Sequence, residues 1–98
     1  MENEIRFEWD QRKSESNRRK HGIDFETAKL VFNDPFYVTE YEGDVHGEAR
    51  WRATGQIGGV IVVLVSHTLH EEGEDEVVRI ISARKASLRE RQKYEEGL

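Results

Sequence analysis

An arginine–lysine pair stands directly before the predicted start of the last helix. Arg84 and Lys85 precede Ser87, which forms with Glu90 the S-x-x-E capping pattern that opens many helices. The first turn of a helix carries free backbone N–H groups that attract anions, so cations are unfavourable there unless an anion lies between them. A guanidinium can bind a phosphate through two parallel hydrogen bonds. The spacing therefore predicts an anion-binding site at Arg84 and Lys85.

Two further arginines lie within predicted strands. Arg79 interrupts an apolar stripe on one face of the segment 77–81. A buried arginine needs a phosphate or an acidic partner, so Arg79 is either a phosphate ligand or half of an ion pair with an acid such as Glu48. Strand alternation places Arg50 opposite Trp51, so burial of Trp51 would direct Arg50 to the other face of the sheet. An exposed arginine, or a salt bridge to Glu48, is the alternative for Arg50.

His21 is the best candidate for acid–base chemistry, because an unperturbed histidine titrates near pH ~6.5. It also ends a predicted helix before Gly22, where it could simply complement the helix dipole. His46, His67 and His70 lie in polar loops or at strand ends and are weaker candidates. His67 and His70 lack a convincing third ligand nearby, so the sequence predicts no metal site.

These residues belong to a predicted α+β domain spanning residues 1–98. Residues 5–9 alternate as a strand, Asp10 and Gly22 bound a helix over 11–21, and Asp24 caps a second helix to about residue 32. Strands are predicted at 36–41, 48–56, 60–66 and 77–83, polar loops at 42–47 and 70–76, and a last helix from Ser87 to about Glu95. Strands grouped together beside separate helices favour an antiparallel sheet with two N-terminal helices and one C-terminal helix, and with 60–66 as a central strand. The first helix lacks large apolar residues, so it must be exposed or held by polar contacts.

Composition narrows the class of protein. The 98 residues contain no cysteine, which excludes disulfide frameworks and thiolate sites. The formal net charge is −5, yet residues 12–20 hold five cationic side chains against one carboxylate, and residues 77–98 hold six against three. This distribution permits a basic patch on an acidic protein, or a solvated surface of mixed sign. The charged N-terminus lacks a signal-peptide pattern, so we expect a cytoplasmic protein without membrane contact.

Several separated motifs resemble those of the BrnT toxin family. The match spans about residues 7–94 and is most specific in R-I-I-S-A-R-K-A at 79–86. Arg12, Ser14 and Arg18 depart from the family pattern, because members more often have alanine or leucine there. The other matching features are F-E-W-D at 7–10, Lys13, Asn17, K-H-G-I at 20–23, Phe25, Asp34-Pro35, Glu48, Arg50, Gly55, Glu90 and Tyr94.

The resemblance implies a RelE-like fold and endoribonuclease activity. Cleavage of RNA without a metal or other cofactor requires a base for the ribose 2′-OH, an acid for the departing 5′-oxygen, and cations for the charge on phosphorus. The cations would be Arg50, Arg79 and Arg84. His21 would be the base or the acid, and Glu48 is an alternative base if burial raises its pKa.

The resemblance also suggests residues that bind the RNA. Lys13, Asn17 and Lys20 share one face of the first helix and could line the RNA path, although a solvated helix face has the same pattern. Lys85 would contact the RNA backbone. Tyr94 either stacks on a base or packs against the sheet, and the second role is the more common one for such a residue.

The family resemblance implies partners as well. They are an RNA substrate and a BrnA-type antitoxin with a ribbon-helix-helix dimer, so that contact with DNA is indirect and the hetero-oligomer represses its own operon. The competing hypothesis is a non-catalytic module that binds the antitoxin and acts only as a corepressor.

Overall fold

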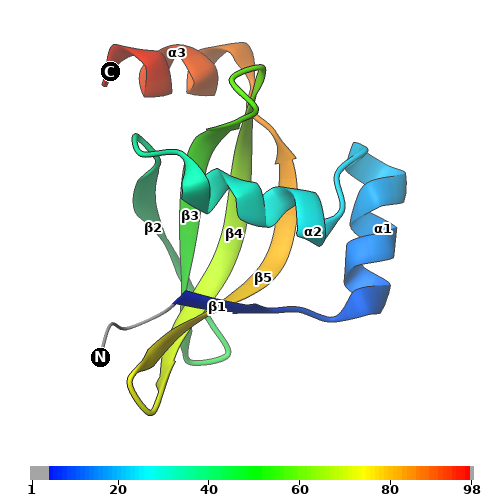
Figure 1. Ribbon diagram of the computed structural model, residues 1–98, viewed down its shortest axis with the longest axis vertical. Helices are drawn as coiled ribbons and strands as arrows, with labels where there is room; N and C mark the ends of the chain where they lie inside the picture. The colour runs from blue at the N-terminus through cyan, green and yellow to red at the C-terminus, as the bar shows by residue number, and fades with distance from the viewer. Residues whose placement is uncertain (1–4, 98) are drawn as a thin grey trace.

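A five-stranded sheet forms the centre of the computed structural model, which describes residues 5–97 (Figure 1). The strand order is β1-β5-β4-β3-β2, with β1 parallel to β5 and every other pair antiparallel. The predicted α+β class and the central position of the segment 60–66 are thus confirmed. The elements are β1 (Ile5–Glu8), α1 (Gln11–His21), α2 (Phe25–Ala28), the 3-10 helix η1 (Lys29–Asn33), β2 (Val38–Val45), β3 (Glu48–Ile57), β4 (Ile61–Glu72), β5 (Asp75–Lys85) and α3 (Leu88–Glu96).

Two predicted loops were wrong in extent. The segment 42–47 is mostly strand, because β2 continues to Val45 and only His46 and Gly47 form the turn. The acidic segment 70–76 is a paired hairpin arm whose ladder extends to Glu72 and Asp75. The acidic side chains of this arm are mostly exposed, so backbone pairing buries little charge there. Its polar composition hid the strands, because such an arm shows no apolar alternation.

Helices α2 and η1 cover one face of the sheet, called the core face below (Figure 1). Phe25, Ala28 and Val31 are fully buried and pack against strand residues such as Val65. Gly55 permits this close approach, because a Cβ atom there would lie 3.0 Å from Val31 Cγ1. The predicted second helix therefore exists, but it tightens to 3-10 geometry from Lys29 onward.

Helix α1 is held to the sheet by polar contacts, as its composition required. The buried Asn17 side chain donates from Nδ2 to the carbonyls of Ile23 and Ala83 and accepts from Ala83 N at Oδ1. The buried Ser14 hydroxyl accepts a hydrogen bond from Phe25 N at 2.9 Å. Asn17 therefore has no free group for RNA, and the proposal that it lines the RNA path is corrected to a structural role.

Substitution of Asn17 by alanine is expected to destabilise the protein by about 2–4 kcal/mol, because it leaves several buried backbone groups of Ile23 and Ala83 unpaired. Urea unfolding monitored by circular dichroism measures this loss. Lys13→Ala is the matched control on the same helix, since Lys13 is exposed, and should change stability by no more than about 0.5 kcal/mol. Equal stability of the Asn17→Ala and Lys13→Ala variants would contradict the anchoring role.

A β-bulge in β5 determines which side chains share the other face of the sheet. Ser82 pairs with Ser66, but Ile80 pairs with His67, so Ile81 is the extra residue. Without the bulge, Arg79 and Arg84 would project from opposite faces, because they are five positions apart. The shift places them on the face that also carries Arg50 and Arg52 of β3. This surface, defined by Arg50, Arg52, Arg79 and Arg84, is called the arginine face.

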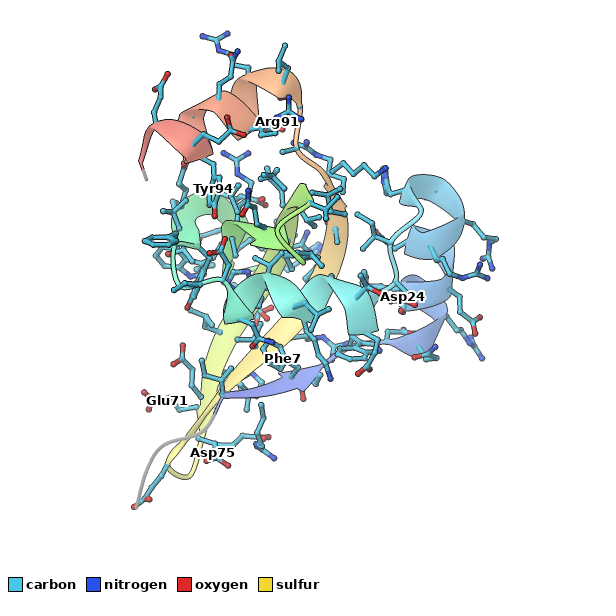
Figure 2. The ribbon with its side chains drawn as sticks, turned by 45° about the horizontal axis from the view of Figure 1, so that its top comes forward. Phe7, Asp24, Glu71, Asp75, Arg91 and Tyr94 are labelled. Carbon is cyan, nitrogen blue, oxygen red and sulfur yellow. The ribbon has the colours of Figure 1, made fainter. Side chains whose placement is uncertain are left out.

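Helix α3 crosses one end of the sheet, and Tyr94 anchors it (Figures 1 and 2). Tyr94 is buried, and its hydroxyl donates to the Asp34 carboxylate, which also accepts from Gln56 N. Burial and then the hydrogen bond to Asp34 raise the pKa of Tyr94 to about 12. Tyr94 therefore packs against the sheet, as its alternative interpretation proposed. None of the helices within residues 5–97 is long and apolar enough to cross a membrane.

Candidate active site

A hollow of about 90 Å³ on the arginine face brings together the end of α1 and strands β2 to β5. Its charged and ionisable lining residues are His21, Arg52, Arg84 and Glu42. Ser66 and Ser82 lie side by side on β4 and β5 and add hydroxyl groups. One candidate acid–base group thus shares a small hollow with two guanidinium groups, which could supply proton transfer and positive charge for the cleavage of a phosphodiester.

The local structure explains why His21 reaches this hollow. Asn17 joins α1 to Ala83, the residue before Arg84. His21 lies one helical turn after Asn17 and therefore projects from the same side of α1. Gly22 then ends the helix in the left-handed conformation, with φ of 75° and its N–H bonded to the Arg18 carbonyl. The histidine is thereby held at the rim of the hollow by the turn that ends its helix.

Arg84 forms a two-pronged ion pair with Glu90 on α3. Its Nη1 and Nη2 atoms lie 2.7 and 2.9 Å from the two carboxylate oxygens. The same carboxylate accepts from Ser87 N at 2.8 Å in a complete capping box. The Arg84 side chain and then the Ser87 N–H lower the pKa of Glu90 to about 2. The anion that the sequence pattern predicted beside Arg84 is therefore the chain's own Glu90.

Arg52 lines the same hollow and was not among the residues predicted from sequence. Its Nη2 lies 3.2 Å from Glu40 Oε2, and its side chain is 33% exposed. The sequence did indicate that Arg52 shares a strand face with Arg50, because the two residues are two positions apart in the predicted strand. No pattern in the sequence, however, indicated that Arg52 rather than Arg50 lies opposite Ser66 at the hollow.

Arg50 and Arg79 lie on the arginine face but outside the lining of the hollow. Arg79 is 41% exposed and lies 3.6 Å from Glu8 of β1, so its acidic neighbour is Glu8 and not the predicted Glu48. It pairs with Thr68, a buried residue whose hydroxyl has no hydrogen-bond partner among the described residues. Trp51 pairs with His67 on the core face, which directs Arg50 to the opposite face as expected.

Comparison with known proteins identifies the family. Residues 9–90 match the family model described as the ribonuclease toxin, BrnT, of type II toxin–antitoxin systems. The chain belongs to the BrnT family of ribonuclease toxins. A search of the curated proteins gave no match. The crystal structure of the Brucella abortus ribonuclease toxin BrnT superposes with a TM-score of 0.56 at 25% identity, covering 88% of this chain and 99% of that one.

The remaining candidate residues of this BrnT-family chain lie away from the hollow. Glu48 is exposed at the start of β3, so the burial that its role as a base required is absent. Lys85 pairs with Val63, whose side chain is on the core face, and therefore projects away from the arginine face. Lys13 and Lys20 are exposed on α1. Of the residues predicted to transfer protons, supply cations or bind RNA, only His21 and Arg84 line the hollow.

Two further observations bear on the chemistry of this BrnT-family site. Within residues 5–97, no three histidine, aspartate or glutamate side chains gather closely enough to hold a metal ion. His67 is buried on the core face, and desolvation is the main cause of its lowered pKa. His67 is therefore neutral and packs edge-on against Phe32, so it has no part in the hollow.

Proposed function

We propose that this BrnT-family toxin is a metal-independent endoribonuclease whose reaction takes place in the hollow between α1 and β5. The observation that supports this most strongly is the meeting of His21, Arg84 and Arg52 in one hollow. Histidine is the side chain best suited to proton transfer near neutral pH. The two guanidinium groups supply positive charge for a phosphate group that becomes more negative in the transition state.

The proposed reaction is internal transesterification of the RNA backbone. A base takes the 2′-OH proton, the 2′-oxygen bonds to phosphorus, and the bond from phosphorus to the 5′-oxygen breaks. An acid then protonates the departing 5′-oxygen, which leaves a 2′,3′-cyclic phosphate and a free 5′-hydroxyl. His21 serves as the base or the acid, and Arg84 and Arg52 bind the phosphate oxygens. Arg50 and Arg79, with the exposed Lys13 and Lys20, contact the RNA beyond the cut.

The proposed partner that silences the toxin is a BrnA-type antitoxin. A segment of the antitoxin that covers the arginine face would exclude RNA from the hollow, and acidic side chains would match the four arginines by charge. The ribbon-helix-helix part of the antitoxin would carry the DNA contacts, so that the complex represses its own operon without DNA touching this chain.

Digestion of RNA by the purified antitoxin-free protein in EDTA tests the ribonuclease proposal. We expect cleavage products with 2′,3′-cyclic phosphate ends, identified by mass spectrometry, because the site provides proton transfer and cationic charge from side chains. The alternative, a non-catalytic corepressor, predicts intact RNA under the same conditions. Intact RNA both with and without added ribosomes would overturn the proposal.

A further inference from the structure

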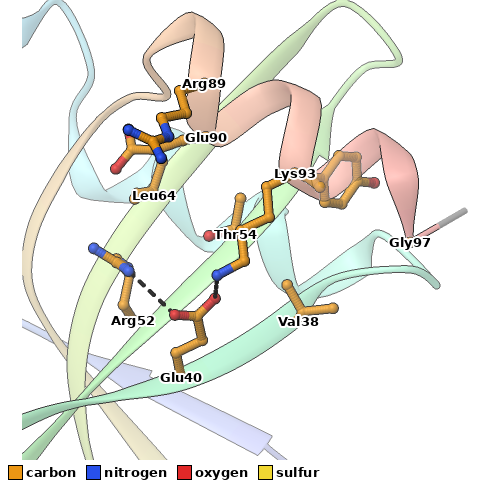
Figure 3. Close-up of a pocket in the computed structure, with 10 residues that line it drawn as sticks. Val38, Glu40, Arg52, Thr54, Leu64, Arg89, Glu90, Lys93 and Gly97 are labelled. Carbon is orange, nitrogen blue, oxygen red and sulfur yellow. Dashed lines mark hydrogen bonds and ion pairs between the residues drawn. The ribbon is translucent and has the colours of Figure 1, made fainter.

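A second pocket, of about 370 Å³, adjoins the hollow beneath α3 (Figure 3). Arg52 and Leu64 line both cavities, so the two are neighbours on the arginine face. The volume lies at the lower end of the range typical of small-molecule sites. Val38, Leu64 and Tyr94 contribute apolar walls, which suit the flat faces of an aromatic ring. A nucleotide whose phosphate lies in the hollow would therefore have a cavity available for its base.

A carboxylate between two cations forms the polar side of this pocket. Lys93 Nζ lies 3.4 Å from Glu40 Oε1, and Arg52 Nη2 lies 3.2 Å from Glu40 Oε2 (Figure 3). Each carboxylate oxygen thus has one cation beside it, which favours this orientation of the group. The charge of Lys93 is the main cause of the lowered pKa of Glu40, so the carboxylate stays ionised and can only accept hydrogen bonds.

We propose that this pocket is a guanine-binding subsite, which deepens the proposed ribonuclease function by naming the base that the site selects. Guanine presents O6, N1–H and N2–H in a row along its Watson–Crick edge. The two N–H donors match the two oxygens of Glu40. Whichever oxygen takes N1–H, the cation beside that oxygen is placed to donate to O6.

The other bases fit this arrangement less well. Adenine and cytosine place a ring-nitrogen acceptor where the carboxylate needs a donor, and uracil offers a single N–H between two carbonyls. A site that hydrogen-bonds one edge rejects analogues that leave its polar groups unpaired. Lys93 lies beside Glu40 with its side chain 74% exposed, and together the two side chains form the proposed recognition edge.

Titration of the full-length protein with 3′-mononucleotides, followed by amide NMR shifts of Thr54 and Leu64, tests the subsite without requiring activity. We expect 3′-GMP to bind about tenfold or more tightly than 3′-AMP or 3′-CMP. Binding of 3′-IMP should be intermediate, because inosine lacks the N2 amino group. Glu40→Gln on β2 should abolish the preference for guanine, whereas Glu96→Gln on α3, which alters an exposed carboxylate that does not line the pocket, should retain it.

Equal binding of 3′-GMP, 3′-AMP and 3′-CMP, or shifts confined to other parts of the sheet, would overturn the subsite. Mapping the ends of cleaved RNA separates this inference from the proposed function on which it rests. Cleavage without a guanosine at a constant position would refute the subsite and leave the ribonuclease proposal intact. Selective binding of 3′-GMP by a protein that cleaves no RNA would support the subsite and refute the ribonuclease proposal.

Discussion

Replacement of His21 by glutamine is expected to lower the rate of RNA cleavage by about 100- to 10,000-fold, the usual contribution of a positioned acid or base. His21 is exposed at the end of α1, so the substitution should leave folding almost unchanged. The rate is measured on a defined RNA under single-turnover conditions, with circular dichroism as the check on folding.

His70→Gln is the matched control for His21. His70 lies on β4, where it pairs with Val77 on the part of the sheet remote from α3, and it does not line the hollow. This variant should cleave RNA at close to the wild-type rate. If His21→Gln and His70→Gln were equally active, the proton transfer would have to be assigned to another group.

Replacement of Arg84 by alanine is expected to slow cleavage by about 100- to 1,000-fold, as happens when one donor to a developing negative charge is removed. The Arg84 side chain is 46% exposed in its ion pair with Glu90, so the free energy of unfolding should fall by no more than about 1 kcal/mol. Arg84→Lys should recover only part of the activity, because lysine keeps the charge but loses the two-pronged geometry.

Substitutions of two other arginines serve as comparisons for Arg84→Ala. Arg91→Ala removes a cation that pairs with Glu95 along α3 and that lines neither cavity, so it should leave cleavage unchanged. Arg79→Ala should have a smaller effect than Arg84→Ala, because Arg79 lies outside the hollow beside Glu8. A loss of activity at Arg79 as large as at Arg84 would move the reaction centre along the arginine face toward Thr68.

Much of the fold could be predicted because its local signals are strong. Asp10, Gly22, Asp24 and the capping box at Ser87 each make the backbone contact that their residue types favour. The apolar run predicted as the central strand forms β4 from Ile61 onward for the same reason, whereas Val60 lies in the preceding turn. The paired acidic arm was missed because exposed strands need no apolar alternation, so pairing there depends on the partner strand and not on local sequence.

The site was harder to predict because long-range geometry decides it. The Ile81 bulge, which places Arg79 and Arg84 on one face, has no signature in the residue types around it. Asn17 was interpreted as a surface residue because helical spacing groups it with Lys13 and Lys20. The helix is rotated so that Asn17 faces Ala83 instead, and this contact carries His21 to the hollow. Spacing along one element cannot show such a contact between two elements.

The pairing of arginines with the chain's own carboxylates has a consequence for the energetics of RNA binding. Arg52, Arg79 and Arg84 face Glu40, Glu8 and Glu90, so the free protein gathers these cations on one face with little mutual repulsion. A phosphate that replaces Glu90 beside Arg84, or Glu8 beside Arg79, exchanges one anion for another. The net number of counterions released on binding is then smaller than it would be if the arginines were unpaired. Because this number sets how steeply affinity falls with salt, we expect a shallow salt dependence of RNA binding. We therefore expect this protein to discriminate by the fit of its substrate and to gain little from bulk attraction to polyanions, in keeping with its net charge of −5.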